Sequence, residues 1–340
     1  EKTDIVSLPA VFGFRVPSYD RVEGLSVVWG PHLSLIGDRL QLDPTATYRS
    51  DLGAFDASTP LDLRLGDDWS IAGSAGRTTP TNDGWIESSL VNSVAVLFVG
   101  HDYRNYWRAD RIQGSLVRSV DSEAGQLALS AGALTERDWS VHAGGPWSLT
   151  GYGSRNGITR PNPTIEHGRL SSVIGRAAAT YSLGAAKLDA AVFVEHPFDA
   201  PRDERFTQTT VDASLDLPTV ASQRVILRTH DVLTAGDTAP PQRFGYLGGA
   251  NTLPTFDVLS LGGDHLVYIR AAYVIPIRAI KIKLIGSPTI SIHDALGAAG
   301  VGRLPRFEQN IGGRLDFSLF WVSYDVDPRS HRDAVSVGLN

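Results

Sequence analysis

The chain has 340 residues with 31 basic and 37 acidic side chains, which give a formal net charge of only −6 at pH 7. Because this balance is mild and spread evenly, no nucleic-acid partner is expected. Cysteine is absent, which excludes disulfides, thiolate metal sites and cysteine nucleophiles. Methionine is absent even at position 1, so we expect Glu1 to follow a removed signal peptide.

Apolar and polar residues alternate through most of the chain, which is typical of β-strands with one dry and one wet face. The clearest example is the segment 210–217, in which Val211, Ala213, Leu215 and Leu217 alternate with polar residues. The candidate strands are 22–36, 39–51, 59–66, 69–78, 102–120, 124–142, 167–182, 184–195, 206–217, 222–235, 264–278, 279–294, 310–318, 319–327 and 333–340. Single-chain bacterial barrels have an even strand number, so we expect about 16 strands, with 14 or 12 as alternatives.

Only Trp85 to Val99 has a helical pattern, since Leu90, Val94, Leu97 and Phe98 share one helical face. We expect a helix in a loop or plug, with a buried strand from Val94 to Val99 as the alternative. The candidate strands would otherwise form one large sheet without a helical layer, and such a sheet must close on itself or split.

Three features favour a transmembrane antiparallel β-barrel over a soluble β protein. The sheet lacks covering helices, and segments such as 102–120 reach the length of about 9–11 residues that a spanning strand needs. Aromatic residues gather near strand ends at Tyr103, Tyr106, Trp107 and at Phe320, Trp321, Tyr324, as interfacial girdles would. In this arrangement we expect the polar face to line the lumen, with charges at Arg224, Arg228, Asp212, Asp216, Lys281 and Lys283.

One region resembles a known family. Arg243-Phe244-Gly245-Tyr246-Leu247-Gly248-Gly249, then Asn251 to Pro254, Gly262-Gly263-Asp264 and the strand Val267 to Ile277, are similar to the inward loop and following strand of the BamA-like bacterial surface antigen superfamily. The opening Tyr19 to Leu25 is similar to the first-strand entry of related barrels. The order Arg243-Phe244-Gly245-Tyr246 differs from the family's usual Arg-Gly-aromatic motif, and Ala272 stands where relatives often carry glutamate.

The resemblance implies that a loop after strand 10 or 11 folds into the lumen, where its Arg243 meets an acidic residue of the wall. The segment Ile290 to Gly297 is similar to the family's later strand, which ends in an aspartate near a glycine. The resemblance therefore implies that Asp294 is the partner of Arg243. We therefore predict an N-terminal periplasmic segment over 1–21 and a barrel over 22–340. The terminal strand lacks the usual final aromatic, so Asn340 is not expected to be the natural end.

No pattern indicates catalysis, a cofactor or a metal. The adjacent pairs His230-Asp231, His293-Asp294 and His101-Asp102 would point to opposite faces of a strand, and no Gly-x-Ser-x-Gly elbow occurs. We expect a multi-pass barrel of a Gram-negative outer membrane that contacts lipid, lipopolysaccharide and periplasmic or outer-membrane proteins. It would act as a translocation or insertion pore, or as a scaffold or anchor of an envelope complex; the alternative is a passive porin.

Overall fold

A computed structural model describes residues 5–145, 147–149, 160–280 and 286–339. These residues are mainly in strands, and they include one short α-helix. The strands are β1 (Val6–Ser7), β2 (Ser18–Asp20), β3 (Gly24–Trp29), β4 (His32–Leu35), β5 (Leu40–Leu42), β6 (Thr45–Arg49), β7 (Ala54–Arg64), β8 (Trp69–Thr78), β9 (Arg108–Ser122), β10 (Gly125–Trp139), β11 (Gly168–Leu183), β12 (Ala186–Asp199), β13 (Phe206–Pro218), β14 (Arg224–Gly236), β15 (Gly245–Leu247), β16 (Leu261–Gly263), β17 (His265–Pro276), β18 (Thr289–Gly300), β19 (Glu308–Asp316), β20 (Phe320–Val326) and β21 (Asp333–Leu339).

All strands except β15 and β16 belong to one sheet of 19 strands. Some short strands continue one another: β3 and β4 form one bent row against β6 and β5, and β1, Phe14 and β2 pair along this row. When β1 is joined to β2, β3 to β4 and β5 to β6, the sheet has 16 rows. The prediction of an antiparallel barrel with about 16 strands is therefore confirmed.

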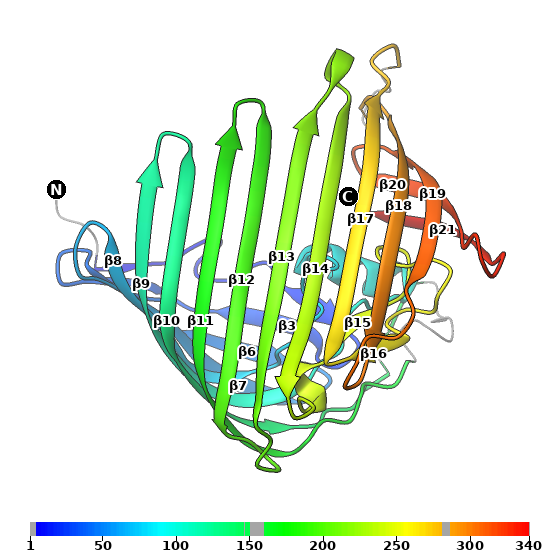
Figure 1. Ribbon diagram of the computed structural model, residues 1–340. Coiled ribbons are helices and arrows are strands. Elements are labelled where there is room, and N and C mark those ends of the chain that lie inside the picture. Colours follow the sequence, from blue (N-terminus) through cyan, green and yellow to red (C-terminus); the bar gives the residue numbers. More distant parts are fainter. Residues whose placement is uncertain (1–4, 146, 150–159, 281–285, 340) are drawn as a thin grey trace.

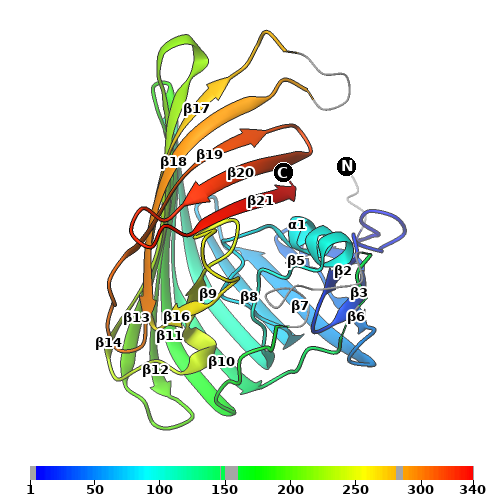
Figure 2. The ribbon, with the colours of Figure 1, turned by 90° about the vertical axis from the view of Figure 1, so that its right-hand side faces the viewer.

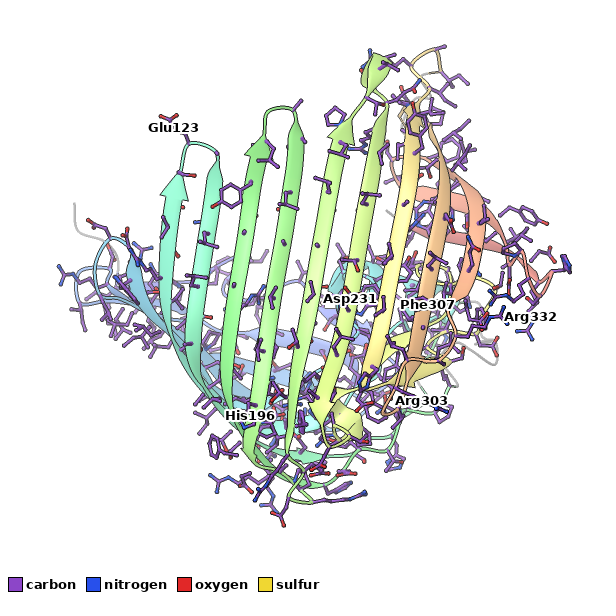
Figure 3. The ribbon with its side chains drawn as sticks, in the orientation of Figure 1. Glu123, His196, Asp231, Arg303, Phe307 and Arg332 are labelled. Atoms are coloured by element: carbon purple, nitrogen blue, oxygen red, sulfur yellow. The ribbon has the colours of Figure 1, made fainter. Side chains whose placement is uncertain are left out.

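The rows follow one another in chain order, so the sheet is an antiparallel meander. Figure 1 shows the long hairpins from β9 to β14 side by side, and Figure 2 shows the sheet curling around a lumen. Short turns join β9 to β10 and β11 to β12 at one end, where Figure 3 places Glu123. Long connections lie at the opposite end, toward His196 and Arg303. Outer-membrane barrels keep short turns on the periplasmic side, so this second end is expected to be extracellular.

Alternation along each strand separates an apolar outer face from a polar inner face. On β12, Val192 and Val194 are exposed to the outside, whereas Glu195 on the other face is buried. Such a band of exposed aliphatic side chains is unfavourable in water and favourable in hydrocarbon, which explains why the sheet suits a membrane.

The segment before residue 22 also contributes to the sheet, because β1 and β2 pair with β4 and β3. The division into a periplasmic segment and a barrel at residue 22 stays a prediction. The predicted strand 279–294 lies partly outside the described residues, as do Lys281 and Lys283; the observed strand begins at Thr289.

The helical pattern at Trp85 to Val99 corresponds to α1 (Ser89–Val94), followed by one π-helical stretch at Ala95–Val99. The helix begins where Ser88 accepts a hydrogen bond from the Val91 amide. The alternative prediction of a buried strand from Val94 to Val99 is therefore wrong. No helix among the described residues is long and apolar enough to span a membrane.

Most of the aromatic residues that we expected in interfacial girdles lie on the lumen side of the sheet instead. Tyr103, Tyr106 and Trp107 are buried between loop and lumen wall, and Trp321 is buried on the inner face of β20. Only Tyr324 of the second group is clearly exposed on the outer face. Their positions near strand ends could not show on which side of the sheet the rings would lie.

We predict that the two faces of β12 tolerate charge differently. Val192→Arg puts a guanidinium in the lipid and should lower the free energy of unfolding by about 2–4 kcal/mol. The neighbouring change Ala191→Arg points to the lumen and should cost much less. Urea unfolding in lipid vesicles measures both; equal losses would contradict the assigned faces.

Candidate functional site in the lumen

The connection between β14 and β17 folds back into the lumen. It contains a short 3-10 turn, Pro241–Arg243, and the two-stranded ladder of β15 and β16. Its apolar residues join wall residues in one buried cluster: Val232, Leu247, Leu253, Leu266, Tyr268, Ala295 and Ala299. Because β14 is the eleventh row, this loop follows the strand that the resemblance indicated, and Figure 2 shows it inside the curve of the sheet.

Two glycines let the loop turn tightly. Gly248 has φ +117°, and a Cβ there would lie 2.1 Å from the Asp257 carbonyl oxygen, so no side chain fits. The Gly248 amide donates to Thr252 Oγ1 at 2.8 Å, and the Gly249 amide donates to the Phe256 carbonyl at 3.0 Å. These bonds fold residues 248–256 into a compact unit over β17 and β18.

A buried ion pair fixes the loop to the opposite wall. The Arg243 guanidinium donates to Glu195 of β12 through Nε at 2.7 Å and through Nη2 at 3.0 Å, and Nη2 also donates to Glu136 of β10. We call these three residues the Arg243 cluster. Burial by itself lowers the pKa of Arg243, but the two carboxylates outweigh it and hold the pKa well above its usual range, so the guanidinium stays charged.

The predicted partner of Arg243 was wrong. Asp294 lies on β18, and its carboxylate accepts from Gln309 Nε2 at 2.9 Å and 3.0 Å. The alternation of β18 places His293 and Ala295 on the buried inner face and Asp294 on the outer one. A resemblance in sequence located the arginine but could not locate acids that lie 48 and 107 residues away in the chain.

Neighbouring polar residues support this cluster. Ser172 donates to Glu195 at 2.7 Å, and Gln208 donates to the Arg243 carbonyl at 3.0 Å. Gln242 donates to Asp138 at 3.2 Å, so the loop contacts β10, β12 and β13 together. The other motif residues surround this contact: Phe244 lies among lumen-wall residues, Gly245 and Tyr246 form β15, and Gly249 closes the turn.

A second buried group joins three extracellular-end connections. Arg21, in the turn after β2, lies 3.4 Å from Asp102 and donates to Asn105 at 3.2 Å and to Asn162 at 3.0 Å. Arg160 also donates to Asn105. These five residues, the Arg21 cluster, tie the first hairpin to the segments 79–107 and 160–167. The sequence drew attention to Arg21 only as part of a strand entry.

Asp83 lies beside the Arg21 cluster and is fully buried. Burial raises the pKa of its carboxyl to about 7, although the Asn105 amide donates to it at 2.7 Å. Burial likewise lowers the pKa of Arg160 to about 10. The segment between β8 and β9 therefore contains a buried carboxyl group that changes charge near neutral pH.

The remaining predicted residues line the other part of the lumen. Arg228 and Asp212 border a cavity of about 520 Å³, Arg224 and Arg228 border a second of about 420 Å³, and Asp216 pairs with Arg224 at 3.0 Å. Two histidines pair with acids of other rows rather than with the acids beside them in sequence. His230 of β14 pairs with Asp212 of the adjacent β13, and His293 of β18 pairs with Asp325 of β20, across β19, both at 2.6 Å. Within the described chain, no group of three or more acidic or histidine residues could hold a metal ion.

Removing Arg243 should release the loop. Arg243→Ala leaves the buried Glu195 without its ion-pair partner and Glu136 with only Arg111 at 3.7 Å, and breaking a buried pair in this way typically costs about 3–5 kcal/mol. We expect faster protease cleavage within 237–264 and a larger single-channel conductance. Asp294→Asn is the control and should match the wild type; an unchanged loop in Arg243→Ala would argue against the ion pair.

Asp83 should make stability depend on pH. Its carboxyl is protonated in the folded state up to about pH 7 but ionises near pH 4 when unfolded, so the folded state binds the extra proton between these values and stability falls as pH rises through them. Asp83→Asn should make the melting temperature vary less between pH 4.5 and about 7.5. Near pH 7.5 the variant should melt at a higher temperature than the wild type. A wild-type slope that persists in this variant would show that Asp83 is not responsible.

No protein-family model and no curated protein matches the sequence. Among solved structures, BamA from Haemophilus ducreyi lacking POTRA domains 1-3 is similar with a TM-score of 0.58 at 12% identity, over 95% of this chain and 69% of that one. CdiB from Escherichia coli has a TM-score of 0.48 at 12% identity, over 94% of this chain and 59% of that one. At this identity the likeness to BamA concerns the fold, and the chain has the fold of a BamA-like transmembrane β-barrel.

Proposed function

We propose that this chain acts in a bacterial outer membrane as a BamA-like barrel that inserts or translocates protein, rather than as a passive porin. The observation that carries the proposal is the loop between β14 and β17, which is fixed in the lumen by the Arg243 cluster. The fold shared with BamA supports the same conclusion.

Passive conduction through an open pore does not require a loop fixed in this way. Fixing it requires burying one cation with two carboxylates, and burial of charges costs free energy that the attraction between them largely offsets but seldom exceeds. The ion pair is therefore better explained by the position it gives the loop than by stability. We propose that the motif residues Arg243 to Gly249 hold the loop in this position while the barrel works.

The arrangement of loops suggests where partners bind. The Arg21 cluster joins three connections at the extracellular end, so this end is a fixed surface. We propose that client or complex partners approach from the periplasmic end, where short turns leave the lumen side of the strands accessible. The outer face would contact membrane lipid and lipopolysaccharide. A scaffold or anchor role in an envelope complex would use the same two surfaces.

The proposal is tested by reconstituting the chain in lipid vesicles and adding a urea-unfolded eight-stranded outer-membrane protein. Insertion activity predicts faster folding of this client than in empty vesicles. Arg243→Ala should lose most of the acceleration while the barrel remains heat-modifiable on a gel, and Asp294→Asn should retain it.

Planar-bilayer recording distinguishes a BamA-like barrel from the alternative, a passive porin. A BamA-like barrel with a fixed lumen loop predicts a small or flickering wild-type conductance. A large, steady conductance together with no acceleration of client folding would overturn the proposal and leave a porin.

A further inference from the structure

The wall between β14 and β17 carries two arginines that face each other. Arg228 and Arg270 are direct partners in the antiparallel register, and both point into the lumen, where both line the two cavities described above. Like charges directly opposite each other on neighbouring strands destabilise a sheet. An acidic neighbour or a bound anion would relieve the repulsion within this pair.

The described residues provide little neutralisation for this pair. Neither guanidinium has a hydrogen-bond or ion-pair partner within residues 5–145, 147–149, 160–280 and 286–339, and Arg270 Nε is buried without an acceptor there. Nearby acids are engaged elsewhere: Asp212 pairs with His230, Asp216 with Arg224, and Asp316 with Arg314. Asp189 also borders the first cavity; it accepts a hydrogen bond from Thr180 at 2.8 Å, which leaves its charge in place.

One further carboxylate is near enough to act by its charge. Glu87, in the segment before α1, has its pKa raised mainly by burial, and Arg314, Arg104 and Arg228 counteract this effect. A single carboxylate shared among three arginines does not neutralise the pair. A positive excess remains along the wall, because five arginines border the two cavities against three carboxylates: Arg176, Arg224, Arg228, Arg270 and Arg314 against Asp189, Asp212 and Asp316.

The cavities have the size and lining of a small-molecule site. Their volumes of about 520 and 420 Å³ meet at Arg228 and Arg270, and pockets of about 300–1,000 Å³ are usual for ligands. Hydroxyl groups of Thr289 and Ser291 lie in the second cavity, and alanines 128, 178 and 191 form an apolar wall in the first. An arginine pair beside hydroxyl donors suits a tetrahedral dianion, and the alanine wall suits an attached apolar group.

We propose that Arg228 and Arg270 form a phosphate-binding site in the lumen, for the phosphate group of a small ester. The phosphate would lie between the two guanidiniums and receive charge-assisted hydrogen bonds from both. This site does not depend on whether the barrel moves protein. A phosphate group could reach it as a free solute or on a lipid headgroup, and the two sources have the same charge chemistry at the arginines.

Titration calorimetry of the detergent-solubilised full chain tests the site with two probes, inorganic phosphate and dihexanoyl phosphatidic acid. We expect saturable binding that Arg228→Gln with Arg270→Gln weakens by roughly tenfold or more, as loss of charge-assisted hydrogen bonds implies. The matched control is Arg303→Gln with Arg306→Gln, which removes the same charge from an exposed extracellular-end loop and should bind as the wild type does. Binding of both probes indicates a free phosphate site, and binding of the lipid alone indicates a headgroup site.

Thermal stability without ligand gives a second measurement. In phosphate-free buffer the double variant should be at least as stable to heat as the wild type, because it removes repulsion between opposed charges. If the double variant does not fold, Arg228→Gln alone gives the same binding test. No saturable binding of either probe, or equal binding by wild type and cavity variant, would overturn the proposal.

Discussion

The buried contact of Arg243 with Glu136 and Glu195 is the interaction on which the arrangement of the lumen depends. It joins a loop near the C-terminal third of the chain to two strands of the opposite wall, at donor–acceptor distances of 2.7 Å and 3.0 Å to Glu195. Without it, the ladder of β15 and β16 would depend on apolar packing against β17 and β18 and on uncharged donors, such as Gln208 and Asn82, that bond to the loop backbone. Arg111 provides a second cation 3.7 Å from Glu136, and Ser172 donates a hydrogen bond to Glu195.

The rest of the interior is built around this contact by loops from the same end. The Arg21 cluster joins the first hairpin, the segment with α1 and the described part of the connection before β11 by polar contacts, beside small apolar clusters such as Val22, Tyr106 and Val141. The periplasmic half of the lumen instead contains open space bordered by arginines. One barrel thus has a fixed end and a charged, accessible end.

Sequence reasoning predicted the strands well because alternation is a local property. The predicted strand 69–78 coincides with β8, and the helix was placed correctly between β8 and β9. The same reasoning failed for Tyr103 and Trp107, since proximity to a strand end does not reveal whether a ring points to lipid or lumen. It also missed Glu136 and Glu195, because register across several rows determines which acid meets Arg243, and no local pattern encodes that register.

The charges that face the lumen also depend on register, which the local sequence pattern does not reveal. Alternation assigned Arg228 to the polar face, but only the register of β14 with β17 reveals that Arg270 lies directly opposite it. A fixed loop, a second cluster at the extracellular end and an unneutralised arginine pair all follow from contacts between distant segments.

Amide hydrogen exchange of the reconstituted protein tests the central claim most directly, namely that the loop is folded and fixed inside the lumen. The account predicts that amides of β15 and of Gly249 exchange as slowly as those of β12 and β14. Exchange of these amides as fast as those of the exposed turn between β9 and β10 would contradict it.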